Sequence, residues 1–401
     1  MAEIHNKKRA GVPSRLTKWA RGGVRRLSAG GAAGRLAQLR ARLAGKSLRK
    51  IVIFSDGLSD TSEQQIQPLV RYRQSIAVQL GFVFEFHHVD QIGHFVAKGL
   101  QGYSGVGLKL VFNTPPAMAK ATATTLFDAA RSVGARCLVF DGDDDPCVHW
   151  PEVIDASDAV IKKHRFADLN AYRRRYVGKT NLTEYCNKTF GVDFSNDTIP
   201  FSGPLSDAQI DKIILGWNIA LDDKIFRLSR DVTRDVLAWP KSLDISCRAS
   251  FQKHVWMYGM RHAAVEALVA LKDKFRVFAP TDRVGQQAYY REMLESRFTV
   301  SPFGCGELCW RDFEAFLCGS VLIKPDMSHI ESWPDLFVAG ETYVPVAWDY
   351  SDLETACKEL VADEPARLAI ATNARDKVLE ALNKKAFLQR LDDTMRAAGL
   401  G

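Results

Sequence analysis

Two glycines and three charged residues in one segment have the types and spacing that could bind a phosphorylated ligand. Gly304 and Gly306 form a loop after an apolar strand, and Glu307, Arg311 and Glu314 follow at positions i, i+4 and i+7. That spacing places the three charged side chains on one face of a helix, which we expect to begin near Glu307. A glycine loop that opens a helix directs backbone N–H groups and the positive end of the helix dipole at one point. A solvated helix face with a weak surface ion pair is the alternative interpretation.

An acidic run follows a predicted strand in the first half of the chain. Asp141, Asp143, Asp144 and Asp145 are followed by His149. Taken alone, the Asp-x-Asp spacing is typical of a site for a divalent cation, as in GT-A glycosyltransferases and some phosphohydrolases. We expect instead that these acids lie at the mouth of a cleft, face the substrate that accepts a transferred group, and hold no metal. An acidic loop that caps the next helix is the other interpretation that stays open.

Three residues are candidates for a general base that would take a proton from an acceptor hydroxyl. They are Asp56, Asp144 and His149, which follow predicted strands at the edge where α/β sheets bind ligands. The basic run 162–165 follows another strand and has two interpretations. It could neutralise a phosphate on the acceptor or pair with the aspartates of 141–145, and we favour the pairing.

The second half of the chain resembles the donor-binding half of GT-B glycosyltransferases. It is most similar to bacterial group 1 enzymes and to the exostosin-like C-terminal pattern, over about residues 245–350. The resemblance implies two Rossmann-like domains that face each other across a cleft, and a glutamate, at the position of Glu314, that hydrogen-bonds the nucleotide ribose. The common form has seven residues between two glutamates, whereas six separate Glu307 from Glu314, so either could hold the donor sugar. The residues that carry the resemblance are Tyr289-Tyr-Arg-Glu-Met-Leu-Glu-Ser-Arg-Phe298, the Ser-Pro-Phe-Gly loop, Arg311-x-x-Glu314-Ala315 and Gly319.

The same resemblance implies a role for Arg248 and Lys253, which come directly after the predicted strand 243–247. In GT-B enzymes an arginine and a lysine five residues apart clamp the donor diphosphate. Two fixed cations there would stabilise the negative charge that develops as the sugar–phosphate bond breaks. Surface cations in a loop are the alternative.

Strands that alternate with helices must position these residues. The alternation predicts doubly wound α/β domains, with a crossover near 236–242 that a proline marks. The predicted strands are 50–57, 82–89, 107–112, 137–140, 159–161, 243–247, 275–279, 298–301, 320–323 and 343–346. The predicted organisation is a basic tail over 1–48, an N-terminal Rossmann-like acceptor domain over 49–240, a C-terminal nucleotide-sugar domain over 241–383, and a last helix over 384–401 that crosses back to the first domain.

Charge is distributed unevenly along the chain. Residues 1–50 hold 14 Lys and Arg against one acidic residue, a net charge of +13, whereas the remainder holds 40 basic against 46 acidic residues, a net charge of −6. Leu36, Leu39 and Leu43 have helical spacing among the basic residues, which suits the surface of an anionic membrane. A disordered, solubilising tail is the alternative. Binding of nucleic acid is not expected, because Trp19 is the one aromatic residue there that could stack on a base.

Composition indicates a globular protein of the cytoplasm. No run approaches the ~18 consecutive apolar residues of a membrane span, and the N-terminus lacks the apolar core of a signal peptide. The eight cysteines are scattered through apolar segments, as expected of reduced thiols. We expect a cytoplasmic protein that associates peripherally with the inner membrane.

The sequence therefore predicts a GT-B glycosyltransferase that moves a sugar from a nucleotide-sugar donor to a glycan or lipid-linked glycan acceptor, in bacterial surface polysaccharide synthesis, with no cofactor. One alternative is a metal-dependent GT-A or phosphohydrolase-like enzyme that uses Asp141–Asp145. The other is a non-catalytic carbohydrate-binding protein docked to a membrane. The sequence leaves the donor base, the donor sugar and the inverting or retaining outcome open.

Overall fold

The computed structural model describes residues 32–43, 45, 47–57, 64–195, 203–232, 234–250 and 255–401. Most of the predicted basic tail and the predicted diphosphate contact Lys253 lie outside these residues. Among the described residues, no helix has the length and the apolar character that crossing a bilayer would require.

The first domain is built on a six-stranded parallel sheet with the strand order β2-β1-β3-β4-β5-β7. Its central strands are continuous apolar runs because helices cover both faces of the sheet, and residues 51–54 are fully buried. The strands of this sheet are β1 (Arg49–Ser55), β2 (Phe82–His88), β3 (Gly105–Lys109), β4 (Arg136–Asp141), β5 (Ala159–Lys162) and β7 (Ile213–Leu215).

Helices α6 and α7 cover one face of this sheet, and α4 and the last helix of the chain cover the other. Residues 67–80 do not form one continuous α-helix, because Tyr72 leaves the helical conformation with φ −101° and ψ 11°. The helical elements in this part of the chain are α2 (Ala32–Leu43), α4 (Gln67–Arg71), α5 (Arg73–Ser75), the π-helical turn η1 (Ile76–Leu80), η2 (Val89–Gln91), α6 (Ile92–Lys98), α7 (Pro116–Ser132), α8 (Pro151–Ala156), η3 (Leu169–Arg173), α9 (Asn181–Phe190), α10 (Asp207–Ile210), η4 (Ile219–Leu221), α11 (Asp223–Asp231) and η5 (Arg234–Ala238).

The second domain has a five-stranded parallel sheet with the order β13-β11-β10-β8-β9. Its strands are β8 (Leu243–Ser246), β9 (Val277–Phe278), β10 (Ser296–Val300), β11 (Val321–Pro325) and β13 (Tyr343–Val346). Its helices are α12 (Tyr258–Val269), α13 (Gln286–Leu294), α14 (Trp310–Leu317), α15 (Leu353–Ala362) and α16 (Glu364–Ala381), and α17 (Lys384–Ala397) ends the chain.

The prediction that a helix begins near Glu307 is wrong by three residues. Helix α14 begins at Trp310, because the side chain of Asp312 accepts a hydrogen bond from the Cys309 backbone N–H at 3.0 Å and caps the helix there. Glu307 therefore lies in the loop, and it does not share a helix face with Glu314. The solvated helix face is also excluded, because residues 312–317 are all buried.

Both sheets have the same topology. Numbered along the chain within each domain, the strands lie in the order 2-1-3-4-5, and the first sheet adds a sixth at its end. The direction of winding reverses between β1 and β3 in the first sheet and between β8 and β10 in the second. Ligands bind at such switch points, beyond the carboxyl ends of the strands. The predicted α/β class with two Rossmann-like domains is confirmed.

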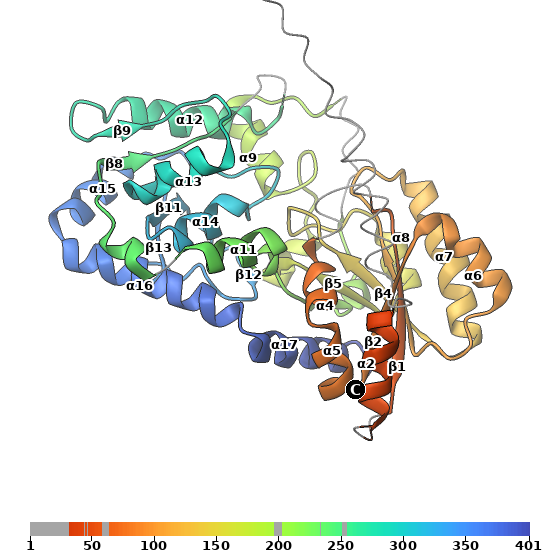
Figure 1. Cartoon of the computed structure of the whole chain (residues 1–401). Coiled ribbons are helices and arrows are strands. Elements are labelled where there is room, and N and C mark those ends of the chain that lie inside the picture. The colour runs from red at the N-terminus through yellow and green to blue at the C-terminus, as the bar shows by residue number, and fades with distance from the viewer. Residues whose placement is uncertain are drawn as a thin grey trace, which may run out of the picture.

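Two features join the domains beyond the connecting segment. The short strands β6 (His164–Phe166) and β12 (Ile330–Ser332) form a two-stranded antiparallel sheet, one strand from each half of the chain. Helix α17 lies against the first domain (Figure 1), where the Arg390 guanidinium donates to the Gly216 carbonyl at 2.9 Å. Both features help to hold the two domains together.

Candidate active site

The loops that leave the carboxyl ends of β4 and β10 touch each other. A Cβ placed on Gly306 would lie 1.5 Å from the carbonyl oxygen of Asp144. No L side chain fits at that distance, so glycine at 306 is what allows the loop of the second domain to reach the acidic loop of the first. The Gly304 backbone N–H donates to the Gly306 carbonyl at 3.0 Å, so this amide is used within the loop itself.

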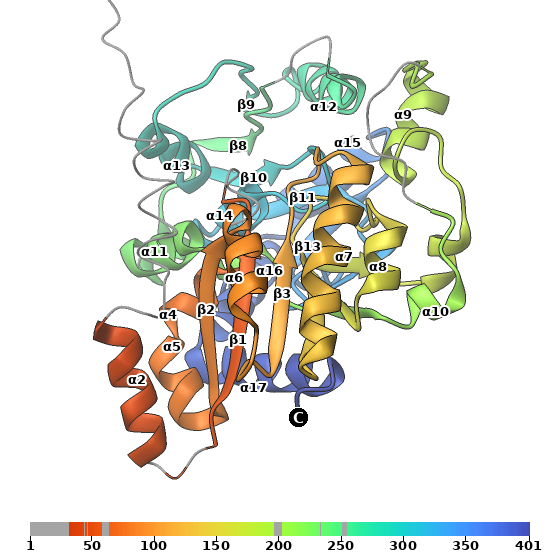
Figure 2. The same ribbon diagram turned by 90° about the vertical axis from the view of Figure 1, so that its right-hand side faces the viewer.

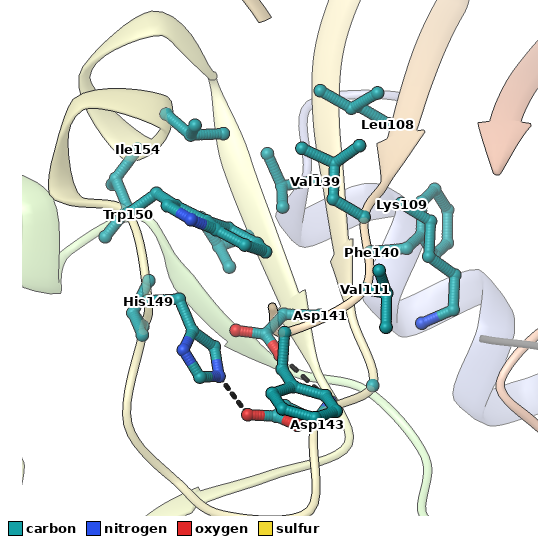
Figure 3. A pocket seen from close by; sticks show the side chains of 16 residues that line it. Leu108, Lys109, Val111, Val139, Phe140, Asp141, Asp143, His149, Trp150 and Ile154 are labelled. Atoms are coloured by element: carbon teal, nitrogen blue, oxygen red, sulfur yellow. Dashed lines mark hydrogen bonds and ion pairs between the residues drawn. The ribbon is translucent and has the colours of Figure 1, made fainter. Parts of the chain in front are cut away.

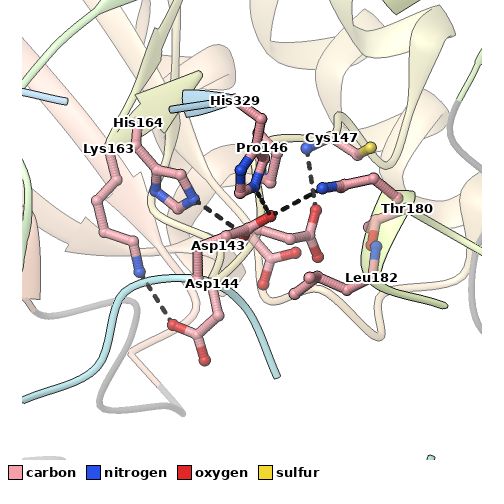
Figure 4. A network of polar contacts seen from close by, with 12 residues as sticks. Asp143, Asp144, Pro146, Cys147, Lys163, His164, Thr180, Leu182 and His329 are labelled. Carbon is pink, nitrogen blue, oxygen red and sulfur yellow. Dashed lines mark hydrogen bonds and ion pairs between the residues drawn. The ribbon is translucent and has the colours of Figure 1, made fainter. Parts of the chain in front are cut away.

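Lysines at the end of β5 neutralise part of the acidic loop. Lys162 Nζ lies 2.9 Å from Asp141. Lys163 Nζ lies 2.9 Å from Asp144, as Figure 4 shows. Both lysine side chains are almost fully buried. The predicted pairing of the run 162–165 with the aspartates is therefore confirmed at these two residues.

Lys179, which precedes α9, pairs with the other two aspartates of the acidic loop. Its ammonium forms ion pairs with Asp143, at 2.6 Å, and with Asp145, and His149 Nε2 also bonds Asp143. Burial alone would raise the pKa of Asp143, but Lys179 and His149 hold it well below its ordinary value. Burial and the neighbouring charge of Asp143 raise the pKa of Asp145 to about 6. The two carboxyl groups thus differ although they share one ammonium.

Two of these carboxylates and the imidazole have the chemistry of a divalent-cation site. Ligand atoms of Asp143, Asp145 and His149 all lie within 4.8 Å of one another. The Lys179 ammonium, however, already contacts both carboxylates, and its pKa is raised by them in spite of its burial. A metal ion would have to displace this internal cation.

A narrow pocket opens beside the cluster, between the ends of β3 and β4 and the start of α8. Figure 3 shows Trp150 and Ile154 on its apolar side, and His149 and Lys109 at its polar end. Lys109 is 1% exposed, and its burial lowers its pKa to about 8 against the opposing charges of Asp141 and Asp56. Asp56 directly follows β1, and Lys109 is the last residue of β3. The two residues therefore mark the switch point of the first sheet.

Glu307 is the centre of a second buried network, between the domains. It is 0% exposed; His329 Nε2 lies 3.1 Å from its Oε1, and His164 Nε2 lies 3.7 Å from its Oε2. Asn181 donates to Oε1 at 3.3 Å. Burial alone would raise the pKa of Glu307, but the contacts with His164 and His329 hold it well below its ordinary value. Glu307 is therefore a buried carboxylate that links the domains.

Two arginines lie at the switch point of the second sheet. Arg261 Nη1 donates to the Ser250 carbonyl at 2.7 Å, and its Nη2 would lie 3.1 Å from a Cβ on Gly304. Burial and the like charge of Arg311 lower the pKa of Arg261. Among the described residues, the buried Nε and Nη1 atoms of Arg311 have no hydrogen-bond partner. The nearby carboxylate Asp312 is already paired with a lysine. Burial would lower the pKa of Arg311, but Tyr289, nearby thiols and Asp312 raise it.

Other predicted donor contacts are occupied by protein groups. Arg248 forms a bidentate pair with Glu292 at 2.6 and 2.8 Å, and it also bonds Asp282. Glu314 is 1% exposed and accepts from Lys224 at 2.7 Å and from the Tyr290 hydroxyl at 3.1 Å. The structure thus brings Gly304, Gly306, Arg311 and Asp144 together and leaves Arg248 and Glu314 engaged elsewhere.

No protein-family model matches the chain, and no curated protein matches its sequence. Among solved structures, it is similar to a glycosyltransferase from Rickettsia africae ESF-5, with 10% identity, 88% of this chain and 98% of that chain covered, and a TM-score of 0.47. It is also similar to an alpha,alpha-trehalose 6-phosphate synthase from Burkholderia multivorans, with 11% identity, the same coverage and a TM-score of 0.43. S. aureus MnaA in complex with UDP matches with 11% identity, coverage of 86% and 97%, and a TM-score of 0.39. Similarity at this level supports no conclusion about function.

Four residues at or beside the candidate site were not identified from the sequence. They are Lys109, Lys179, Arg261 and His329. Lys109 was detectable in principle, because a lysine within the apolar run 105–112 signals a buried charge that needs a partner. Arg261 and Lys179 gave no such signal, since one lies on an ordinary helix and the other in a polar loop. His329 is brought to Glu307 only by the pairing of β6 with β12.

Proposed function

We propose that the protein is a glycosyltransferase that binds a nucleotide-sugar donor at the switch point of its second sheet. The observation that carries the proposal is the cation pair Arg261 and Arg311 beside the glycine loop, because the buried Nε and Nη1 atoms of Arg311 have no hydrogen-bond partner among the described residues. A diphosphate would fill this need, because its oxygens accept several charge-assisted hydrogen bonds. The leaving diphosphate gains charge as the glycosidic carbon departs, and fixed cations stabilise it.

The first domain would supply the acceptor side of the reaction. His149 lines the narrow pocket and is fixed through Nε2 by Asp143, while its buried Nδ1 has no hydrogen-bond partner among the described residues. In the proposed step the acceptor hydroxyl oxygen forms a bond to the anomeric carbon and its proton passes to His149. The bond from that carbon to the phosphate oxygen breaks, and the diphosphate takes the electron pair. Such a displacement inverts the anomeric centre.

Contact between the loops of Gly306 and Asp144 supports the same proposal, because it brings the donor and acceptor sides within reach of each other. Asp56 and Asp144 remain second-choice bases. Arg248, Lys253, Glu307 and Glu314 remain predicted donor contacts. We propose a glycan or lipid-linked glycan as the acceptor, and a role in bacterial surface polysaccharide synthesis, on the basis of the sequence.

The test is a thermal-shift titration with UDP, GDP, dTDP, CMP and their sugars, with and without EDTA. A nucleotide at 100 times its dissociation constant should raise the free energy of unfolding by about 2.7 kcal/mol. We expect one nucleotide family to stabilise the wild type regardless of EDTA and to lose this effect in Arg311→Met. The matched control is Arg276→Met, which removes an arginine that is paired with Asp244 and lies away from the loop. If no nucleotide shifts the wild type, the proposal is wrong.

A metal-dependent reaction at Asp143, Asp145 and His149 is the second candidate, because their ligand atoms converge. It predicts that Mg²⁺ or Mn²⁺ stabilises the protein in the absence of nucleotide and that Lys179→Met strengthens this effect. Indifference of both proteins to the metals would exclude it.

A further inference from the structure

Helix α2 rests on the first domain through one face only. It packs against η1 and α5, and Ala41, which is fully buried, forms a small apolar cluster with Ala77, Val83 and Leu48. Figure 2 shows α2 at the outer edge of the first domain, away from the strands of the second. The opposite face of α2 is therefore not covered by either sheet.

That opposite face carries leucines where a surface helix ordinarily carries polar residues. Leu36, Leu39 and Leu43 are 41%, 54% and 79% exposed. At 3.6 residues per turn the three side chains fall within a stripe roughly 60° wide, on the side of the helix away from Ala41. Single exposed leucines are common on proteins, but three in one stripe form an apolar surface that calls for a partner.

Arginines border this leucine stripe on both sides. At the same helical pitch, Arg35 and Arg42 lie along one edge and Arg40 along the other, and all three are exposed. The Arg40 side chain donates a hydrogen bond to Gln74 at 3.2 Å, whereas no ion pair with a carboxylate is found for these three arginines within the described part of the chain. An apolar stripe between two cationic edges is the pattern of a helix that lies in the interface of a bilayer.

We propose that α2 docks the protein on an anionic lipid bilayer. The leucine stripe enters the boundary between headgroups and acyl chains, and the arginines contact lipid phosphates, because long cationic side chains reach the headgroups while their stems cover apolar surface. Charge complementarity decides for lipid: the +13 of residues 1–50 is attracted to an anionic surface, whereas the −6 of the remainder would be repelled by it. The inference does not rest on the proposed glycosyl transfer.

The test is co-sedimentation of the full chain with phosphatidylcholine vesicles, with and without an equal share of phosphatidylglycerol. The stripe variant is Leu36→Gln/Leu39→Gln/Leu43→Gln, since glutamine preserves helix propensity. Its matched control is Met118→Gln/Val269→Gln, which removes two apolar side chains that are 59% and 48% exposed on other helices. Thermal midpoints confirm that the variants are folded, and the single variant Leu43→Gln serves if the triple variant is not.

We expect binding to the anionic vesicles only, a loss of at least about tenfold in the stripe variant, and no change in the control. Replacing Arg35, Arg40 and Arg42 by glutamine should lower binding about a hundredfold, at roughly fivefold per arginine. A chain that starts at Ala32 should keep part of the binding. Equal binding by wild type and stripe variant, or no binding by the chain from Ala32, would overturn the proposal in favour of residues 1–31. A concentration-dependent dimer that the stripe variant abolishes would overturn it in favour of self-association.

Discussion

The loops that follow the two sheets differ in how their charged side chains are paired. Beyond the first sheet, three lysines pair with the four aspartates of 141–145, Asp143 and Asp145 sharing one of them, and the side chains are mostly buried. Beyond the second sheet, Arg261 and Arg311 lie together, and the nearby carboxylate is committed to another partner. The same topology thus supports a neutralised cluster in one domain and an excess of positive charge in the other. Neutralised clusters stabilise a fold, whereas an unmatched cation pair is poised for an anion that the protein itself does not supply.

The comparison predicts that removing a cation changes the free energy of unfolding in opposite directions in the two regions. The change should be larger in the neutralised cluster. Lys179→Met leaves Asp143 and Asp145 without their shared ammonium, and loss of one partner of a buried pair typically costs about 3–5 kcal/mol of stability. Urea denaturation measures the change. Lys188→Met, which removes a lysine that is 64% exposed, is the control and should change stability by less than about 0.5 kcal/mol. A value for Lys179→Met as small as that of the control would break the comparison.

Lys109 should make the stability of the protein depend on pH, with an effect somewhat smaller than that of Lys179→Met. Its pKa is about 8 in the folded protein, below its ordinary value of 10.5, so the unfolded chain binds more protons between these values. The free energy of unfolding of the wild type should therefore rise by about 3 kcal/mol from pH 8 to pH 10.5, relative to Lys109→Met. Chemical denaturation of both proteins across this range measures the difference. Parallel curves would show that the ammonium is solvated.

Glu307→Gln sharpens the comparison at the boundary between the domains. Its carboxylate is held ionised by His164 and His329, and hydrogen bonds to a charged group contribute about 1.5–3 kcal/mol. Because its folded-state pKa is depressed, this contribution is fully present above about pH 4.5 and is lost as the pH falls through the folded value. The variant should be less stable than the wild type at pH 7 and should approach it on acidification. A constant difference at all pH values would contradict this assignment.

Arg311→Met should have the smallest effect on stability, with the opposite sign. A buried cation without a full set of partners destabilises the free protein, so its replacement should leave stability unchanged or raise it by up to about 1 kcal/mol. The same denaturation experiment measures it, with Arg276→Met as the comparison. A loss of more than about 2 kcal/mol would mean that Arg311 stabilises the fold and is not held ready for an anion.

Local patterns in the sequence predicted most of the strands and helices, because buried parallel strands are continuous apolar runs such as Ile51-Val-Ile-Phe54. They missed β7, β6 and β12, which have only three residues each and depend on pairing with distant segments. They also placed the start of α14 at Glu307, because spacing cannot show that Asp312 caps Cys309.

Some residues of the candidate site were predictable from the sequence, but their contacts were not. The aspartates, Gly306 and Arg311 were identified from their types and spacing. Whether Arg311 meets a carboxylate, as Arg248 does at Glu292, depends on tertiary packing. The close contact between Gly306 and Asp144 was likewise not visible in the sequence.

The antiparallel pair β6 and β12 has a consequence for movement between the domains. Its backbone hydrogen bonds would be kept during a rotation whose axis passes through the pair, and the pair would then be the pivot of that rotation. Groups beside a pivot travel least: His164 belongs to β6, and His329 directly precedes β12, so both would stay with Glu307 in a more open form. Arg261 and Arg311 belong to other elements, α12 and α14. A rotation of this kind would leave the network around Glu307 intact.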